Sequence, residues 1–455
     1  MWGGLRSKHT TRSRAKAYRF EALSQQRHPF LNSNFHITAN KLIRQKARGL
    51  VHDNPIATRA KAIYPAYVGP IRPFVHNSSK SKRHALVQEK LDEFFKTTNC
   101  DIQGLSNLSD IQSRMIGSMV EDGESFIERV WVNDWKEKSL PVPIQLKVVG
   151  AETVSMETDR KNKKIYGFEV DKYGRRTYVH LQSEKGLYKA SFSDFAHLFK
   201  VQTTNQLRGL SWFTPLVIRL KDVDQYQDAT TVMMKMASMY VGSWEDTGSG
   251  YELGREFSDI EIDQLVESLM SKVTPGTILP PVPRRRLTFN NPPQAGNFRE
   301  NNQEFIRAIS TGLNVPSVLL TNDYSESNRA SMRVNFSDFE RHILTEQNRW
   351  ITQVGNKLVW WFKEALDSIS IPTTDIKIGW ILPRKIQVEP DKEMSAMMVE
   401  IGAGLKSPFE AMRELGREPE EVLEEIRHAQ NRFNECGFTQ VMAGQQMTIY
   451  NKEDE

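Results

Sequence analysis

Two long helical patterns that enclose a short proline-rich segment constrain the fold of this chain more than any other feature. From Pro215 to Val241 apolar residues recur every three or four positions, which places them on one face of a helix. About 27 residues at 1.5 Å each make this helix roughly 40 Å long, with Thr214 predicted as its N-cap. The same spacing predicts a second helix from Asn297 to Leu313. An insert whose two ends leave through paired helices projects from the body of a protein.

The segment between the two helices is predicted to be a compact α/β insert of roughly 50 residues. A polar break over Trp244–Gly250 follows the first helix, and a short helix is expected over Phe257–Lys272. Two strands are expected over Thr277–Leu279 and Arg286–Phe289, on either side of a proline-rich turn.

Helices and a small antiparallel β region are predicted before the first long helix. The helical patterns cover Ile37–Ala66, Ser81–Thr97 and Ser109–Met119. Short alternating segments then predict strands over Phe126–Trp131, Ile144–Val149, Ile165–Val170 and Arg176–Leu181, with Asp171–Gly174 as a hairpin connection.

After the second long helix the chain is predicted to be mostly helical, so the fold class is α+β and mainly helical. A loop over Asn314–Asn328 comes first. The remaining elements are a long helix over Asn328–Leu366, a strand over Ile376–Leu382, helices over Asp391–Gly402, Pro408–Leu415 and Pro419–Asn434, and a tail from Gly437.

Length, charge and cysteines limit the class of protein. A chain of 455 residues is expected to form two to four packing units. Its net charge is only +5, but residues 1–50 are strongly basic and the C-terminal part is acidic. Neither a secretory signal nor a membrane span is present in the sequence, so the protein is expected to stay in the cytoplasm where it is made. Cys100 and Cys436 lie too far from other ligands to predict a disulfide or a metal site, and no cofactor is expected.

An enzymatic function is compatible with the sequence but is not favoured by it. Asp122 and Glu124 could bind Mg²⁺ in a DNA-processing nuclease, although two carboxylates at a glycine turn more often form a cap and a salt bridge. The motifs for phosphate cradling, zinc proteolysis and serine hydrolysis are absent from the sequence. A third interpretation is a minor capsid or adaptor protein without a channel.

Several residue runs, in their order along the chain, resemble the lambda-type portal proteins of tailed bacteriophages. The runs are Arg44–Pro55, Asp122–Phe126, Ala196–Phe199, Gln206–Trp212, Tyr226–Ala229, Gly312–Pro316, Leu319–Ser325, Pro390–Glu393 and Gly404–Leu405. Each run alone is unspecific, but their joint order over roughly residues 40–435 is highly specific. The chain departs from the pattern at Glu389-Pro390, where the family usually has Asp-Pro, and at Asn328–Ser331, where it commonly has Tyr or Asn with paired serines.

The resemblance implies a portal fold with wing, stem, clip and crown regions, assembled as a ring that is usually of twelve subunits. The implied regions are a flexible basic arm (1–20), the wing (21–212), the first stem helix (213–241), the clip (242–296), the second stem helix (297–313), the tunnel loop (314–329), a long channel or wing helix with a return strand (330–390), the crown (391–435) and a tail (436–455).

The implied function is that of the ring at one capsid vertex. Through it the terminase motor packages double-stranded DNA, which later leaves by the same route, and to it the tail or a head-tail adaptor attaches. Further partners would be the major capsid and scaffolding proteins, with a role in nucleating procapsid assembly. The protein would be found in the virion and, during assembly, in the host cytoplasm. It would not be an enzyme and would have no membrane partner.

Such a conduit must contact phosphate without holding it, because each neutralised phosphate adds salt-sensitive affinity. The absence of sequence-reading motifs in the sequence fits contact with DNA that is independent of its sequence. The candidates for contact with DNA are Lys221, Lys235 and Arg307 on the paired helices, and Asn322, Asp323, Ser325, Asn328 and Arg329 in the tunnel loop. Arg284, Arg285 and Arg286 are the candidates for the terminase or adaptor interface at the clip. For the cations of the paired helices and the clip, the alternatives are salt bridges between subunits or a solvated surface. For the tunnel-loop residues, the alternative is simple solvation of the loop.

Overall fold

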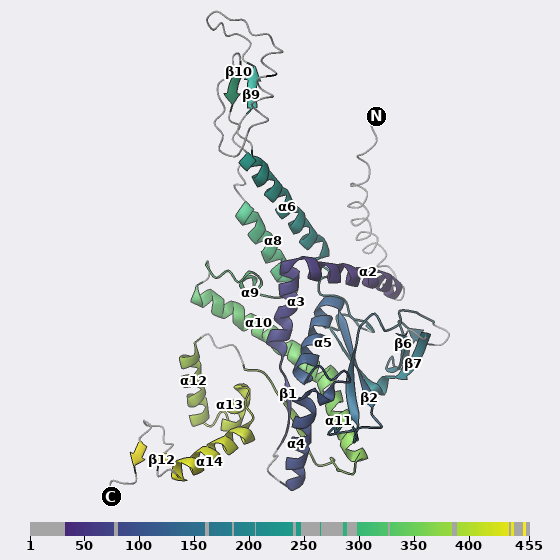
Figure 1. Cartoon of the computed structure of the whole chain (residues 1–455), viewed down its shortest axis with the longest axis vertical. Coiled ribbons are helices and arrows are strands. Elements are labelled where there is room, and N and C mark those ends of the chain that lie inside the picture. The colour runs from purple at the N-terminus through teal and green to yellow at the C-terminus, as the bar shows by residue number, and fades with distance from the viewer. Residues whose placement is uncertain are drawn as a thin grey trace, which may run out of the picture. The chain divides into compact units, whose positions relative to one another are not determined.

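The fold is α+β and mainly helical, as predicted (Figure 1). The computed structural model describes residues 32–76, 81–159, 163–183, 186–204, 206–239, 243–246, 264, 285–288, 298–325, 328–384, 389–435, 438–440 and 449–451. Two compact units are present, one formed by Met1–Val217 with Leu313–Glu455 and the other by Ile218–Gly312. The predicted basic arm over 1–20 lies outside the described residues.

The first unit begins with two helices where the sequence pattern predicted one. Helix α2 spans Asn32–Asp53 and α3 spans Pro55–Val68. Asn54 separates them because its side-chain oxygen accepts hydrogen bonds from the backbone N–H groups of Ile56 and Ala57, at 2.9 and 3.0 Å. Pro55 takes the first helical position, where a missing N–H costs nothing. The continuous helix predicted over Ile37–Ala66 was therefore wrong at this cap.

The next two helices confirm the sequence pattern. Helix α4 spans Lys82–Phe95, and α5 spans Leu108–Asp122. Asn107 and Asp110 cap the start of α5 reciprocally, since each side chain accepts a hydrogen bond from the other residue's backbone N–H. Helix α5 packs against α3 on one side and against the central strand of a sheet on the other.

The predicted β region forms two antiparallel sheets. In the first, the strand order is β3 (Ile144–Val149), β2 (Glu124–Trp131) and β8 (Phe195–Phe199); in the second it is β4 (Lys164–Ile165), β5 (Phe168–Val170), β6 (Arg176–Ser183) and β7 (Gly186–Ser191). Strands β7 and β8 were not predicted. The single strand predicted over Ile165–Val170 was wrong, because Tyr166 and Gly167 have positive φ and turn the chain. The hairpin at Asp171–Gly174 is confirmed by the hydrogen bond from Asp171 N to Arg175 O, 2.9 Å.

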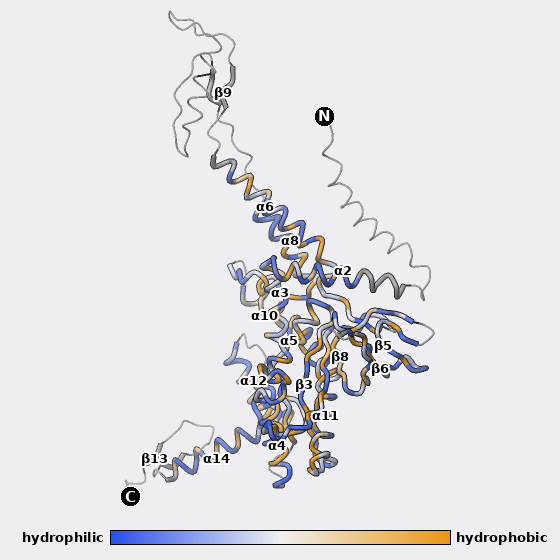
Figure 2. Tube along the Cα trace, turned by 45° about the vertical axis from the view of Figure 1, so that its right-hand side comes forward, coloured by the Kyte–Doolittle hydropathy of each residue, from blue (hydrophilic) through white to orange (hydrophobic). Residues whose placement is uncertain are grey.

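Apolar side chains from both sheets share one core. Phe126, Val149, Phe168, Val179, Leu181 and Phe195 are buried together. Figure 2 shows hydrophobic stretches along the strands, alternating with hydrophilic ones. Strand β8 is buried at every position, and Phe126 and Ile127 are both buried on β2, so the first sheet is covered on both faces and only one of them belongs to this core.

The predicted long helix over Asn328–Leu366 is confirmed, with one irregularity. Helix α10 (Arg329–Trp350) continues through a π-helical segment, Ile351–Gly355, into α11 (Asn356–Ser368). Here the rings of Trp350 and Trp380 meet edge to face, with centroids 5.2 Å apart. A Cβ on Gly355 would lie 2.9 Å from the Trp380 ring, so only glycine leaves room for it.

Strand β11 (Ile378–Ile381) confirms the predicted return strand and pairs antiparallel with β1 (Arg72–Val75). Strand β1 was not predicted, because Pro73 within it and Gly69 and Pro70 before it indicated only a break. The predicted loop over Asn314–Asn328 contains a short helix, α9 (Ser317–Thr321). Helices α12 (Pro390–Gly402), α13 (Pro408–Glu414) and α14 (Pro419–Glu435) are confirmed. The predicted tail holds β12 (Phe438–Gln440) and β13 (Ile449–Asn451).

The second unit holds most of two helices that lie side by side, α6 (Val217–Met239) and α8 (Phe298–Leu313) (Figure 1). The N-cap predicted at Thr214 was wrong. A turn precedes the helix, in which Phe213 O accepts from the N–H groups of Leu216 and Val217, and the Thr214 hydroxyl donates to Ser211 O.

The described part of the predicted insert is a pair of strands. Strand β9 (Ser243–Asp246) occupies part of the predicted polar break and pairs antiparallel with β10 (Arg285–Thr288), which overlaps a predicted strand. The helix predicted over Phe257–Lys272, apart from Gln264, and the strand predicted over Thr277–Leu279 lie outside the described residues.

Candidate functional site

Helix α6 presents two different faces within the second unit. One face meets α8: Gln227 donates a hydrogen bond to Asn302, 2.9 Å, and the Tyr226 ring lies 5.7 Å from the Phe298 ring. At about 100° per residue, Ile218 and Val232 fall on the opposite side of the helix. They are 50% and 54% exposed. The face that turns away from α8 thus carries exposed branched apolar side chains.

The two lysines predicted to contact DNA lie beside this outward face. Lys221 and Lys235 are exposed and stand fourteen residues apart, within about 40° of each other around the helix axis. Asp228 lies midway between them on the same stripe. The structure therefore brings the predicted cations onto one line, but that line alternates cation and anion.

Arg307 lies on α8 and is exposed, and its guanidinium donates to Glu304 one turn earlier, at 2.9 Å. Both side chains are more than half exposed, so the pair is screened by water and weak. Arg307 is not fixed to a distant element, and its cation is largely balanced locally.

The predicted tunnel-loop residues bind mainly to their own segment. Asn322 has a positive φ at the end of α9 and accepts a hydrogen bond from Arg59, 3.2 Å. Asp323 accepts from the backbone and the hydroxyl of Ser325, at 3.0 and 2.6 Å. Asn328 caps α10 by accepting from Ser331 N, 2.8 Å. Four of the five predicted residues are exposed, namely Asn322, Asp323, Ser325 and Asn328. The side chain of the fifth, Arg329, lies outside the described part of the structure.

Of the three predicted clip arginines, Arg285 and Arg286 lie in strand β10, and Arg284 lies outside the described residues. In the antiparallel register Arg285 pairs with Asp246, and Arg286 pairs with Glu245. The backbone thus places two basic positions directly opposite two acidic ones.

The strongest concentration of buried charge is elsewhere, at Glu124 on β2. Its carboxylate is fully buried and accepts from Arg44, from Arg208 Nε at 2.7 Å and from the backbone N–H of Gly209 at 2.8 Å. Burial alone would raise the pKa of Glu124, but the charges of Arg208 and Arg44 and a hydrogen bond from His197 hold it well below its usual value. Glu124 is therefore an anion in the interior, surrounded by donors.

His197 on β8 extends this cluster, and its neighbours fix its tautomer. Arg176 can only donate, and it donates to His197 Nδ1, so that nitrogen must be the acceptor. The proton then sits on Nε2, which donates to Glu124 at 3.0 Å. Burial lowers the pKa of His197 to about 3, which keeps the ring neutral at physiological pH. The flat faces of Phe126 and Phe199 enclose the imidazole at centroid distances of 4.1 and 4.2 Å.

Two glycines let the backbone approach this cluster. Gly123 has φ +90°, and a Cβ there would lie 2.2 Å from the carbonyl carbon of Leu210. A Cβ on Gly209 would lie 2.0 Å from Gly123 O. The segment that leads towards α6 is therefore held against the start of β2 by close backbone contact as well as by charge.

Asp122 binds a separate arginine. Its two carboxylate oxygens accept from Arg48 Nε and Nη2, both at 2.7 Å, and Arg48 also reaches Glu152 at 2.6 Å. The prediction that Asp122 and Glu124 form salt bridges is confirmed. Both carboxylates bind arginines, which disfavours the alternative of a shared Mg²⁺ site. In the part of the chain that the structure describes, no group of three or more His, Cys, Asp or Glu is placed to hold a metal ion.

The runs that contain most of these residues are recognisable in the sequence, but their meeting in space is not, and no role was predicted for Arg44, Arg176, His197 or Arg208. The available signal was that each charged residue stands beside apolar residues that predict burial, as in Phe195–Phe199. Among the described residues no helix is both long and apolar enough to cross a bilayer.

Comparisons with known proteins point to one family. The family model described as phage portal protein, lambda family, matches residues 32–347, more than half of the chain. A probable portal protein of Halomonas phage phiHAP-1 is 21% identical over 385 residues, which cover 78% of this chain and 71% of that protein.

Two solved structures have a similar fold. A chain from the neck of a native gene transfer agent particle, computed with C12 symmetry, matches with a TM-score of 0.52 and 14% identity, covering 82% of this chain and 94% of that one. A chain from the neck of an empty particle, computed with C6 symmetry, gives 0.54 and 16%, covering 82% and 93%. At such identities the likeness concerns the fold. The family model decides the assignment: the chain belongs to the lambda family of phage portal proteins, which are structural proteins and not enzymes.

Proposed function

We propose that this chain assembles with copies of itself into a ring at one capsid vertex, and that double-stranded DNA passes through the ring. The number of copies proposed is twelve, a symmetry used for a neck whose chains share this fold. The proposal includes the regional assignment of wing, stem, clip, tunnel loop and crown made from the sequence. The observation that carries it is the outward apolar face of α6.

The outward face of α6 carries two exposed branched apolar side chains that α8 does not cover, and these favour contact with a partner. Ile218 and Val232 are half exposed in the single chain, on the side away from the Gln227–Asn302 hydrogen bond. Water would be excluded from these two side chains if the helix pair α6–α8 of a neighbouring copy packed against them. A contact that joins two different surfaces of identical chains closes into a ring when the rotation per copy divides a full turn.

A weakly charged lumen suits DNA that has to move. Each phosphate neutralised by a fixed cation adds affinity that falls with salt, and many such contacts would stop translocation. Lys221 and Lys235 alternate with Asp228, and Arg307 is paired with Glu304, so the paired helices offer contact with little net charge. The chain as a whole carries +5, which twelve copies would combine into a general attraction for DNA.

The finer parts of the proposal follow from membership of the family. The terminase motor would bind at the clip near Arg284, Arg285 and Arg286 and drive packaging, and a head-tail adaptor or tail would attach there after packaging. Major capsid and scaffolding proteins would surround the ring, which would nucleate the procapsid. The protein would be part of the virion and, before that, of the host cytoplasm.

Light scattering on the purified chain, together with electron micrographs of end views, tests the ring. The expected mass is about twelve times that of one chain, with a central opening. Val232→Glu should reduce the ring fraction strongly, because it places a charge on the outward face of α6. Val201→Glu is the matched control, since Val201 is 55% exposed in a loop of the other unit. A monomer that cleaves DNA when Mg²⁺ is added would refute the proposal and support the nuclease alternative.

A further inference from the structure

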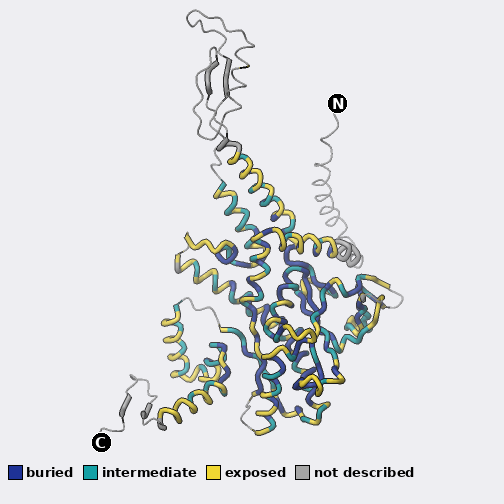
Figure 3. Tube along the Cα trace, viewed as in Figure 1, coloured by how far each residue is buried: buried dark blue, intermediate teal, exposed yellow. Residues whose placement is uncertain are grey.

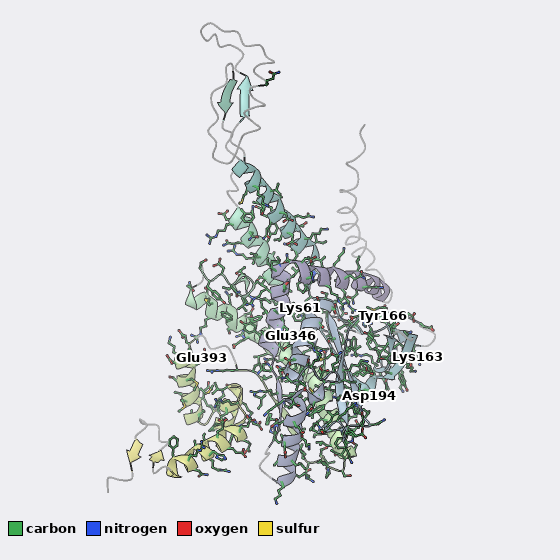
Figure 4. All side chains as sticks on the ribbon, in the orientation of Figure 1. Lys61, Lys163, Tyr166, Asp194, Glu346 and Glu393 are labelled. Atoms are coloured by element: carbon green, nitrogen blue, oxygen red, sulfur yellow. The ribbon has the colours of Figure 1, made fainter. Side chains whose placement is uncertain are left out.

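The C-terminal helices leave a large apolar surface uncovered in the single chain. Helix α12, whose first turn is marked by Glu393 in Figure 4, has no buried residue along its whole length (Figure 3). Met398 and Val399 are 66% and 70% exposed, and Leu405 beyond the helix is 80% exposed. Among the described residues, Met397 and Ile401 of α12 are only half-buried. Because an isolated helix of this length is marginal in water, α12 would gain from further packing.

A groove lies beside α12. Its volume is about 430 Å³, and it is lined by Arg384, Met394, Met412, Leu415, Arg417 and Val422. Both charged lining residues are arginines, and Arg417 is exposed. Methionine side chains adapt to the shape of what packs against them. The groove therefore suits an apolar side chain that is accompanied by a carboxylate.

Helix α14 carries such a combination further along the same chain. At about 100° per residue Ile426, Ala429 and Phe433 form one stripe, and Glu425 borders it. Phe433 is 40% exposed, and Ala429 and Glu425 are exposed as well. The start of α14 is fixed to its own chain by the ion pair of Glu421 with Lys96, 2.9 Å. Only the later part of the stripe is left for a partner.

We propose that the stripe of α14 from one copy packs onto α12 and the groove of the next copy, with Phe433 entering the groove and Glu425 meeting Arg417. The two surfaces are both apolar and carry opposite charges, and they lie on different helices, as a repeating contact around a ring requires. This inference rests on the proposed ring. It concerns one contact between neighbouring copies, and the ring could also form in the absence of that contact.

A charge swap in the full chain tests the contact. Glu425→Arg and Arg417→Glu are each expected to lower ring stability, seen as a rise of about tenfold or more in the concentration at which rings dissociate. The double variant, which restores opposite charges, should recover most of the loss. Glu424→Arg is the matched control, because Glu424 points away from the stripe and should change little.

Cross-linking gives a second measurement that does not depend on ring stability. In a Cys436→Ser background, Met394→Cys with Phe433→Cys should yield a ladder of covalent oligomers with a short bis-maleimide. Leu105→Cys with Phe433→Cys is the control, since Leu105 is 77% exposed in a loop far along the chain from these helices. Rings that give no ladder, and that both single reversals leave unchanged, would overturn this contact while the ring itself stands. Absence of any ring would overturn both proposals.

Discussion

Replacing Glu124 by glutamine tests whether the buried cluster holds the first unit together. Glutamine keeps the shape of the side chain and one acceptor oxygen, but it removes the negative charge and introduces an N–H₂ group. That group would face donors on every side, namely the guanidinium groups of Arg44 and Arg208 and the Nε2–H of His197. Two buried cations would then lack their anion.

The structure sets the size of the effect. Glu124 is 0% exposed, and the side chains of Arg44 and Arg208 are 7% and 4% exposed, so water cannot replace the lost partner. Removing one member of a buried, hydrogen-bonded ion pair costs about 3–5 kcal/mol. At about 1.4 kcal/mol per factor of ten, this corresponds to a change of roughly two to three and a half powers of ten in the opening equilibrium.

Native-state hydrogen exchange is the suitable assay, because it reports local opening in a protein with more than one unit. Amides of β2 and β8 should exchange faster in Glu124→Gln by roughly two to three and a half powers of ten. Amides of α8, most of which lies in the second unit, serve as the internal reference.

Glu152→Gln is the control variant, since the Glu152 side chain is 61% exposed and also pairs with an arginine, Arg48 at 2.6 Å. Exposed pairs contribute at most about 1 kcal/mol. If Glu124→Gln and Glu152→Gln change the exchange rates of the β2 amides equally, the buried charge cluster at Glu124 does not stabilise the first unit.

Three further predictions follow from single features. Gly123→Ala should destabilise the first unit by about 2–4 kcal/mol in denaturant unfolding, because it combines a positive φ with a steric clash, whereas Gly174→Ala, at φ +80° with open space around it, should cost only about 1 kcal/mol; equal losses would contradict the clash. Glu418 is 8% exposed, and burial together with the charges of Glu421 and Asp92 raises its pKa to about 7, so its contribution to stability is full below about pH 4 and is lost as pH rises through 7. Glu418→Gln should therefore slow proteolysis of α13 and α14 strongly at pH 8.5 and less at pH 5.5, where Glu418 is still protonated in the folded chain but already ionised in the unfolded one, while the exposed Glu424→Gln changes neither. Reversing the charges of Arg284–Arg286 should impair DNA packaging while rings still form in micrographs, and normal packaging would remove these residues from the path of DNA or motor.

Helices were predicted from the sequence more accurately than strands. The long helical patterns gave α6, α8 and the α10–α11 rod nearly at their observed bounds, because apolar spacing over many residues reports one buried face. The split at Asn54 was missed, although Asn-Pro is a recognisable start signal, because the apolar pattern continues across it.

Strand pairing and the buried cluster were beyond the reach of local patterns. Strand β1 pairs with β11 about 300 positions later in the chain, and nothing in either short segment specifies the partner. The two-residue turn that separates β4 from β5 depends on Gly167, whose Cβ would clash with Ser155 O. Such a contact exists only after folding. Glu124 likewise gathers partners that are separated by 73 to 85 positions.

Four of the nine runs that carried the resemblance contribute residues to the cluster at Glu124. Arg44, Asp122–Phe126, His197 and Arg208 belong to four separate runs, each of which is unspecific on its own. In the structure they depend on one another, because a buried charge is stable only when all its partners are present. Exchanging one apolar core residue for another of similar size usually costs less than about 1.5 kcal/mol, whereas losing one member of this cluster costs several. The buried cluster around Glu124 is therefore expected to tolerate single substitutions less well than the apolar core does.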